Sequence, residues 1–384
     1  MSLSATPSAG VSPIRVLLIS TSYPLDADDW RGLFISQLVN ALARNNCIDL
    51  RIWAPPGKLP DQVTPVWSAD DEDWLRQLML DGGISHLLRT RRLRALIRAA
   101  SLLRRLARRY RQPNEYDVLH INWLQCALPL PNNGVPALLA VLGNDLELLN
   151  LPLVKLRLRR VMRRRAVKIC PNAEWMEAPL NEAFGDVAEV QAVPFGIEPV
   201  WYGIKRQPCV DAQEWLAVTR LTRAKLGPLF DWSASLFAGH SRRLHLFGPM
   251  QEEMELPDWV HYHGSTTPEQ LSQEWFPRAN GLITLSQHAE GRPQVMLEAM
   301  AAGLPIIASN RPAHAQLIQH GVTGWLCDTK SEYAQAIEAL EDLSVNESLG
   351  RAARSRVEQH IGTWDDCATR YIALYRELLA KHHA

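Results

Sequence analysis

The amino-acid sequence predicts an α/β protein built on two parallel sheets, each in its own domain. Short apolar runs alternate with helical patterns along the chain, which is typical of parallel strands joined by helices. The chain has 384 residues, more than a single hydrophobic core usually supports. Apolar residues make up 47% and charged residues 21% of the sequence, which are the proportions of a globular protein and not of a disordered one.

The expected strands are short runs of four to seven residues. In the first half, a buried strand at Ile14–Ser20 is followed by a helix at Gly32–Arg44. Further strands of this half are expected at Ile48–Trp53, Val118–Ile121 and Ala137–Leu142. The second half has similar runs at Glu214–Val218, Arg243–Phe247, Val260–His263, Gly281–Leu285 and Pro305–Ala308.

The chain is expected to divide into four parts. Residues 1–13 form a loose tail, 14–200 the first domain, 201–362 the second, and 363–384 a closing helix with apolar residues near the 3.6-residue period. The boundary lies in Glu198–Asp211, where prolines and mixed polarity indicate a linker. The tail lacks the features of a secretory signal, and no apolar run approaches the roughly 20 residues that span a bilayer. We therefore expect a cytoplasmic protein.

Charge is balanced overall but not along the chain. Lys+Arg and Asp+Glu number 41 each, yet Arg89–Arg111 and Lys155–Lys168 are strongly basic. Six scattered cysteines show neither metal-ligand spacing nor a disulfide framework, which fits a reducing compartment. No nucleic-acid partner is expected.

The first basic stretch predicts an amphipathic, arginine-rich helix. Its apolar stripe consists of Leu93, Leu96, Ile97, Ala100, Leu103 and Ala107. Two interpretations stay open. The stripe packs on the sheet with its arginines in solvent, or residues 89–111 and 155–168 dock on the inner face of an anionic membrane, where each cation contributes about 1 kcal/mol.

Residues 281–308 combine a strand, a loop, a helix, a tight turn and a second strand. Strong helix formers fill Gln294–Ala302, and Gly303 stands where a helix C-cap glycine belongs. Glu290 is therefore expected on the loop and Glu298 on the helix. Ligands of open α/β sheets bind at this edge, where helix N-termini attract anions and carboxylates accept hydrogen bonds from vicinal hydroxyls. The pattern indicates a polyhydroxylated, phosphorylated ligand.

The same segment, E-G-R-P-x-x-x-L-E-A-M-A-A-G-L-P-I-I-A, resembles the E-x7-E signature of retaining glycosyltransferases of family 4. The resemblance implies a GT-B fold, in which two Rossmann-like domains with parallel sheets face a central cleft and the closing helix crosses back to the first domain. It implies that Glu298 binds the nucleotide ribose and Glu290 the donor sugar. Backbone amides of Gly291, Arg292, Pro293, Gln294 and Val295 would lie near the sugar and diphosphate.

Three further segments resemble the family more loosely. Trp215-Leu-Ala-Val-Thr-Arg220-Leu-Thr-Arg-Ala-Lys225 implies that Arg220 and Lys225 neutralise the diphosphate, so that no metal ion or other cofactor is required. Gly32 would let the backbone approach the donor phosphate, and His120, in Asp117-Val-Leu-His120-Ile-Asn-Trp123, would belong to the active site. The family pattern is broken at Thr219, Leu226, Asn122, Leu142 and Gln316.

The implied activity is a retaining, metal-independent hexosyl transfer from a nucleotide diphosphate sugar to the hydroxyl of a glycan or lipid-linked acceptor. The first domain would face the acceptor and the second would bind the donor, in the biosynthesis of a lipopolysaccharide, capsule or exopolysaccharide. Alternatives are a nucleotide-sugar epimerase or a sugar phosphorylase of the same fold, and a non-catalytic sugar-nucleotide-binding protein.

Overall fold

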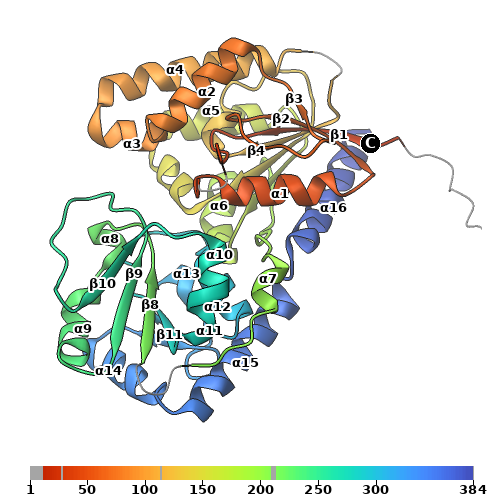
Figure 1. The fold of residues 1–384 in the computed structure, drawn as a ribbon. Helices are drawn as coiled ribbons and strands as arrows, with labels where there is room; N and C mark the ends of the chain where they lie inside the picture. Colours follow the sequence, from red (N-terminus) through yellow and green to blue (C-terminus); the bar gives the residue numbers. More distant parts are fainter. Residues whose placement is uncertain (1–11, 27–28, 113–114, 209–212, 384) are drawn as a thin grey trace, which may run out of the picture.

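A computed structural model describes residues 12–26, 29–112, 115–208 and 213–383 of the protein (Figure 1). Within these residues the strands form two sheets. The first has seven strands in the order β3-β2-β1-β4-β5-β6-β7, and the second has six in the order β10-β9-β8-β11-β12-β13. Every strand pairing is parallel. The prediction of an α/β protein with two parallel sheets is therefore confirmed.

The first sheet and the helices on it are called the first unit. Its strands are β1 (Ile14–Ile19), β2 (Ile48–Trp53), β3 (Thr64–Pro65), β4 (Val118–Asn122), β5 (Ala137–Val141), β6 (Val167–Pro171) and β7 (Glu189–Val190). Its α-helices are α1 (Leu33–Ala43), α2 (Ala69–Leu80), α3 (Gly83–Thr90), α4 (Arg92–Arg109), α5 (Pro152–Met162) and α6 (Glu177–Phe184). Short helical turns are η1 (Leu124–Ala127), η2 (Gly143–Asn150) and η3 (Glu174–Met176).

The second sheet and its helices are called the second unit. Its strands are β8 (Glu214–Val218), β9 (Arg243–Phe247), β10 (Val260–Gly264), β11 (Gly281–Thr284), β12 (Ile306–Ser309) and β13 (Trp325–Cys327). Its helices are α8 (Arg223–Leu226), α9 (Leu229–Phe237), α10 (Pro268–Gln270), η4 (Leu271–Trp275), α11 (Phe276–Arg278), α12 (Gln294–Ala301), α13 (Pro312–Ala315), α14 (Lys330–Ala339) and α15 (Leu343–His360).

Both faces of the first sheet are buried, as parallel sheets require. Val16 and Leu18 point to one face and pack with α1 and α16 (Trp364–His383). Leu17 and Ile19 point to the other face, which α2, α4, α5 and α6 cover. The continuous apolar run of β1 follows from this two-sided burial.

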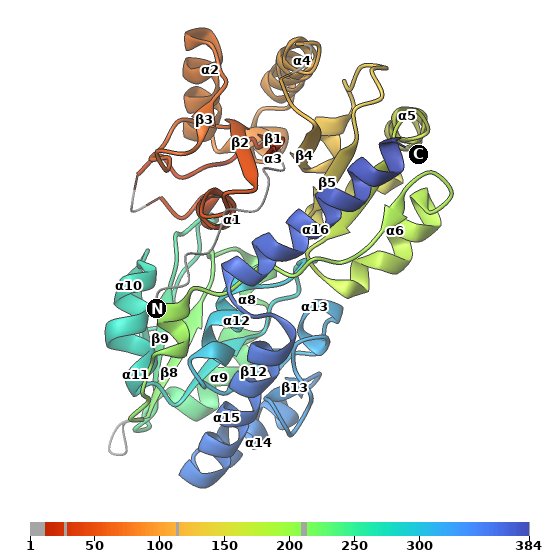
Figure 2. The same ribbon diagram turned by 90° about the vertical axis from the view of Figure 1, so that its right-hand side faces the viewer.

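Two segments join the units. Glu198–Asp211, expected to be an irregular linker, contains helix α7 (Pro199–Tyr202), whose Trp201 packs on Phe276 with ring centroids 5.0 Å apart; residues 209–211 lie outside the described residues. Helix α16 leaves the second unit and runs along the first sheet (Figure 2). The domain boundaries at residues 200 and 362 stay a prediction, and residues 1–11 of the expected tail are not described.

Candidate active site

Glu290 lies in the loop between β11 and α12, in an almost buried ion pair. Its Oε1 is 2.8 Å from Lys225 Nζ and accepts a hydrogen bond of 2.8 Å from Ser286 Oγ. Both charged side chains are only 12% exposed. Burial by itself would raise the pKa of Glu290, but the charge of Lys225 and the two hydrogen bonds outweigh it, so the pKa is below its ordinary value. Glu290 is therefore ionised near neutral pH.

Lys225 reaches this position from helix α8, directly after β8. Thr222 caps the helix and accepts a hydrogen bond from the Lys225 amide at 3.2 Å. Leu226, which departs from the family pattern, is buried in the core beneath the loop. Gly227 follows at φ 54°, and a Cβ there would lie 2.1 Å from the carbonyl oxygen of Leu285. The buried side chain of Leu226 thus anchors a turn whose backbone packs closely against Leu285, directly after β11.

Arg220 lies at the end of β8, where the first unit meets the second. Its Cζ is 5.8 Å from the ring centroid of the exposed Trp30, in the loop between β1 and α1. Arg31 holds that loop by contacts of 2.7 Å to both Asp29 Oδ1 and the carbonyl oxygen of Met79. The contact is a cation–π pair between the two units.

Gly32 caps helix α1 with φ 74°. A Cβ at this position would lie 2.6 Å from Ser22 Oγ and 2.7 Å from the amide nitrogen of Tyr23. Only glycine fits both the backbone angle and this close approach. The backbone of the loop between β1 and α1 therefore requires a glycine at this position whether or not a ligand is bound. Contact of Gly32 with a phosphate stays a prediction.

Glu298 lies on α12, the helix that follows the Glu290 loop, and its side chain is half-buried. Among the described residues, none donates a hydrogen bond to its carboxyl group. Burial raises its pKa to about 8, and the nearby Glu198 adds to the rise. A carboxyl group without a protein donor can bind the hydroxyl groups of a ligand.

Hydrogen bonds and an ion pair connect the loop after Glu290 to the first unit. Trp175 Nε1 donates to the Gly291 carbonyl at 2.9 Å, and Arg292 pairs with Glu174. Gln294 Nε2 donates to the carbonyl of Gly196 at 2.9 Å. The side chains of Arg292 and Gln294 thus join the two units, which leaves the loop backbone as the part that can contact a ligand.

Two glycines make this junction close. A Cβ on Gly291 would lie 2.3 Å from Asn172 Oδ1, and one on Gly143 would lie 2.5 Å from the Gly291 amide nitrogen. Pro293 precedes the first residue of α12 and Val295 lies in its first turn. Contact of these residues with a sugar or a diphosphate stays a prediction. Nothing in the sequence pattern pointed to Asn172, Glu174 or Trp175.

His120 does not reach this site. The strand was expected to end at Ile121, one residue after His120; β4 ends at Asn122, and the side chain of His120 is fully buried. Its Nδ1 is 2.6 Å from Tyr375 Oη, and its ring lies 4.8 Å from that of Tyr371. Burial lowers its pKa to about 3. His120 is a neutral core residue beneath helix α16.

A histidine that the sequence analysis missed stands behind Glu290. His314, on α13, is buried, and its Nδ1 is 2.8 Å from the Ser309 carbonyl oxygen. Ser309 Oγ in turn donates to the Ser286 carbonyl at 2.6 Å. Burial lowers the pKa of His314, although the Ser309 carbonyl and Glu290 oppose the shift. The chain Ser286–Ser309–His314 therefore supports the loop that carries Glu290.

The two basic stretches are less uniformly exposed than their composition suggests. In α4, Arg105 pairs with Asp70 and Asp71, and Arg109 with Glu115. Lys168 belongs to β6 and is buried between Glu189 and Glu377, each 2.7 Å away. The expectation that all of 155–168 forms a basic surface is therefore wrong at its C-terminal end, because Lys168 is needed inside the sheet layer.

No three His, Cys, Asp or Glu side chains of the described part of the chain are arranged to hold a metal ion. No helix within the described ranges is both long and apolar enough to cross a membrane.

Residues 236–359 match the family described as glycosyl transferases group 1. This match covers most of the second unit, from the end of α9 to α15. Both Glu290 and Glu298 lie inside the matched glycosyl transferase segment. Spore coat protein SA of Bacillus subtilis is 29% identical over 140 residues, which are 35% of each chain. The chain spans 35% or less of the length of the curated relatives it matches.

Solved structures resemble the whole chain. Sucrose-phosphate synthase from Thermosynechococcus elongatus has a TM-score of 0.71 at 18% identity, over 96% of this chain and all of its own. Anabaena Alr3699/HepE in complex with UDP-glucose has a TM-score of 0.62 at 14% identity, over 94% of this chain and 99% of its own. These likenesses, with the two parallel sheets, confirm the predicted GT-B fold. The family match over residues 236–359 confirms the resemblance of this segment to glycosyltransferases.

Proposed function

We propose that the protein is a retaining glycosyltransferase that moves a sugar from a nucleoside diphosphate sugar to an acceptor hydroxyl. The observation that carries the proposal is the almost buried Lys225–Glu290 pair at the end of β11. On the helix that follows, the carboxyl group of Glu298 has no donor among the described residues. These groups stand at the carboxyl edge of a parallel sheet, where phosphorylated ligands bind. The complex of a structural neighbour with UDP-glucose supports this class of donor.

The proposed roles follow from the charges. Lys225 uses one N–H for Glu290 and keeps two for diphosphate oxygens, and Arg220 adds a second cation. Together they would stabilise the charge that develops on the leaving diphosphate without a metal ion. Glu290 would bind donor-sugar hydroxyls and Glu298 the ribose. The leaving diphosphate would assist attack of the acceptor on the same face, so the reaction needs positioning more than a side-chain base.

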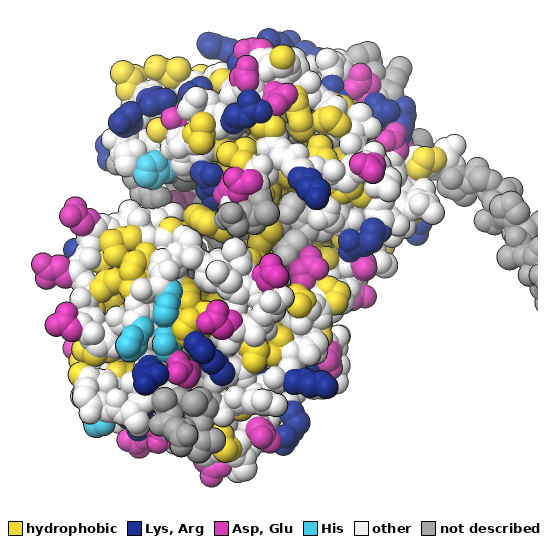
Figure 3. All heavy atoms as spheres, viewed as in Figure 1, with side chains coloured by type: hydrophobic (Ala, Val, Ile, Leu, Met, Phe, Trp, Pro, Cys, Tyr) yellow, Lys and Arg dark blue, Asp and Glu magenta, His cyan; other side chains and the backbone are white. Residues whose placement is uncertain are grey.

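We further propose that the acceptor is a glycan or lipid-linked sugar met at the cytoplasmic face of a membrane, in the synthesis of a surface glycan. Leu93, Leu96 and Ile97 of α4 are 74%, 61% and 63% exposed, whereas Ala95, Leu102 and Leu106 form the buried face of the helix. Apolar and basic side chains gather at that end of the α3–α4 pair (Figure 3). Helix α4 thus packs on the sheet through its buried face, and the exposed leucines and isoleucine at its N-terminal end favour membrane docking as well.

The docking proposal is tested with a variant that changes only exposed side chains. Leu93→Ser with Leu96→Ser should weaken binding to anionic vesicles about tenfold or more, because each buried leucine contributes about 1.5–3 kcal/mol. Leu343→Ser with Val322→Ser, at exposed apolar positions of the second unit, serves as the control. Equal binding of both variants and the wild type would contradict docking through α4.

The catalytic proposal is tested by incubating the protein with a panel of nucleotide sugars and acceptor glycans. Release of nucleoside diphosphate should depend on the acceptor, and NMR of the product should show the anomeric configuration of the donor retained. Product formed without an acceptor would indicate an epimerase, and a requirement for free phosphate would indicate a phosphorylase. Binding of a nucleotide sugar without turnover on any acceptor would favour a non-catalytic binding protein.

A further inference from the structure

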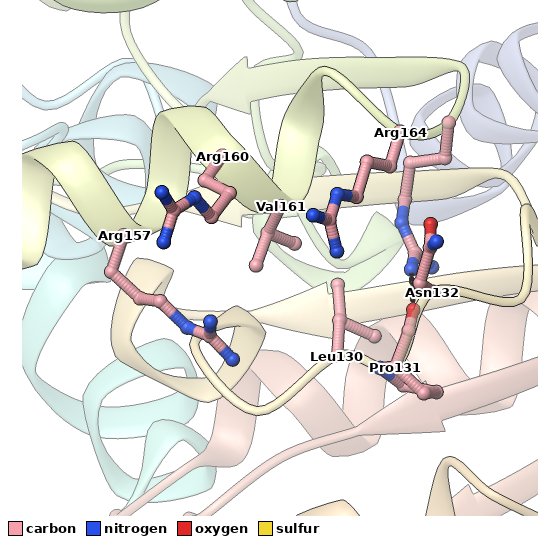
Figure 4. Close-up of a pocket in the computed structure, with 8 residues that line it drawn as sticks. Leu130, Pro131, Asn132, Arg157, Arg160, Val161 and Arg164 are labelled. Atoms are coloured by element: carbon pink, nitrogen blue, oxygen red, sulfur yellow. Dashed lines mark hydrogen bonds between the residues drawn. The ribbon is translucent and has the colours of Figure 1, made fainter.

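Helix α5 and the turn after it carry a group of arginines that the transferase site does not use. The guanidinium groups of Arg157, Arg160 and Arg164 gather around Val161 and Leu130 (Figure 4). All three arginines are exposed, and the cavity among them has a volume of about 20 Å³. This group of three arginines is called the arginine cradle.

The positive charge of the arginine cradle is not compensated by the protein. None of its three arginines forms an ion pair with a carboxylate of the described residues, and Arg157 has one hydrogen bond, to the Leu128 carbonyl at 3.3 Å. The neighbouring Arg159 and Arg163, by contrast, both pair with Asp186. Like charges held this close repel each other, so a bound anion would lower the energy of the cradle.

The floor of the cradle is positive as well. Arg165 donates hydrogen bonds to the carbonyls of Val135, at 3.0 Å, and Pro131, and forms no ion pair with a described carboxylate. Burial lowers the pKa of Arg165. Arg165 therefore adds positive charge below the cradle, while the guanidinium groups of Arg157, Arg160 and Arg164 supply donors whose forked geometry matches phosphate oxygens.

Apolar side chains stand directly beside the cradle. Leu153 and Leu156, one turn earlier on α5, are 81% and 60% exposed. A phosphate next to two protruding leucines is the chemistry of a phospholipid surface, in which the head group lies above the acyl chains. A small, soluble phosphate compound would leave the two leucine side chains exposed to water.

We propose that the arginine cradle binds the phosphate of an anionic membrane lipid while Leu153 and Leu156 enter the acyl region. The inference deepens the proposed membrane contact and rests on it. Helix α5 follows η2 directly, and η2 begins at Gly143, which contacts the Glu290–Gly291 loop. Arg157, the first arginine of the cradle, lies six residues after Leu151, the N-cap of α5, which is about 9 Å along the helix axis at 1.5 Å per residue. A lipid held there would keep the junction of the two units at the bilayer surface.

The test uses the full-length protein and vesicles of phosphatidylcholine with and without phosphatidic acid. Arg157→Gln, Arg160→Gln and Arg164→Gln together should lower binding to phosphatidic acid vesicles about 100-fold, and added salt should lower wild-type binding. The control combines Arg243→Gln, Lys330→Gln and Arg351→Gln, which removes three exposed cations from the second unit. Equal losses in both triple variants, or none in the cradle variant, would overturn the proposal.

A second arm separates lipid from soluble phosphate. Inorganic phosphate should change the Tm of the wild type and the cradle variant equally. A rise in Tm for the wild type alone, without vesicle binding, would assign the cradle to a soluble phosphate and overturn the lipid assignment. Neither arm measures sugar transfer, so both results can be interpreted even if the protein is not a transferase. The variant with serine at Leu93 and Leu96 tests docking through the first basic stretch separately.

Discussion

The loop after β11 and the strand β4 both carry a residue that resembles the family's active site, yet the structure gives them opposite environments. Glu290 stands in a loop, 2.8 Å from the ammonium group of Lys225. His120 stands inside its strand, enclosed by tyrosines of α16. A histidine near the end of a strand therefore belongs to a site only if its side chain reaches that edge of the sheet, and the side chain of His120 packs against α16 instead.

The electrostatics of the two regions differ accordingly. The charge of Lys225 keeps the pKa of Glu290 below its ordinary value in spite of burial. Burial without a charged partner lowers the pKa of His120 to about 3, so its ring stays neutral at physiological pH. Only the Glu290 region can hold and redistribute charge during a reaction.

The largest effect is expected from Glu290→Gln. The variant keeps the size of the side chain but leaves Lys225 without a counter-charge, so we expect kcat for sugar transfer to fall 100-fold or more. Loss of one partner of a nearly buried pair should also lower the free energy of unfolding by about 3 kcal/mol. Steady-state kinetics and denaturant unfolding measure the two effects. Full activity in the folded variant would remove Glu290 from the site.

Glu298→Gln should act mainly on the donor. Replacing one carboxyl oxygen by an amide nitrogen removes an acceptor for the ribose hydroxyls, which should raise the donor KM about 10- to 100-fold while kcat changes less. Initial-rate measurements at varied donor concentration separate the two parameters. An unchanged donor KM would contradict the ribose assignment.

Glu298 also predicts a pH effect on stability. Its pKa is raised in the folded state, so the folded protein binds more protons than the unfolded chain between pH 4.5 and about 8. Stability from this group therefore falls as the pH rises through that window. Chemical unfolding of the wild type and Glu298→Gln across this range should show the variant gaining relative stability toward pH 8. A constant difference would contradict the raised pKa.

Trp30→Ala should have a smaller effect. Removal of the ring that faces Arg220 loses a cation–π contact of about 0.5–1 kcal/mol, so we expect kcat/KM for the donor to fall about two- to fivefold. Trp30→Phe should restore most of the loss, since phenylalanine also offers an aromatic face. Equal losses in both variants would argue against the cation–π contact.

The smallest effect on activity is expected from His120→Phe. The substitution leaves the Tyr375 hydroxyl without its partner, so the free energy of unfolding should fall by about 1–3 kcal/mol. Sugar transfer at a temperature where the variant is folded should stay within about twofold of the wild type. A tenfold loss of kcat in the folded variant would place His120 in the reaction after all.

Much of the second unit could be predicted from local sequence. Helix formers and a C-terminal glycine place Glu298 on α12, and Gly303 has the expected left-handed φ of 70°. The partners of His120 could not be predicted, because Tyr371 and Tyr375 lie more than 250 residues away in the chain. The spacing of apolar residues in a short segment predicts whether it forms a helix or a strand, but it does not predict which distant residues pack against it.

The basic stretches show the same limit. The apolar stripe of α4 has helical periodicity whether it faces the sheet or the solvent, and only the structure shows Leu93 and Leu96 outside. Lys168 was read as part of a basic surface, although it belongs to a buried strand and is neutralised by Glu189 and Glu377. Charge composition does not reveal which cations are paired.

We propose that Lys225 and Glu290 form the diphosphate end of a donor site. The most direct measurement is the change in Tm of the wild type, Lys225→Met and Lys330→Met with a panel of nucleoside diphosphates and their sugars. A ligand that binds only the folded state at 100 times its Kd stabilises it by about 2.7 kcal/mol. We expect at least one nucleotide to raise the Tm of the wild type and of Lys330→Met, and to have little effect on Lys225→Met. An equal rise in all three proteins would contradict the account.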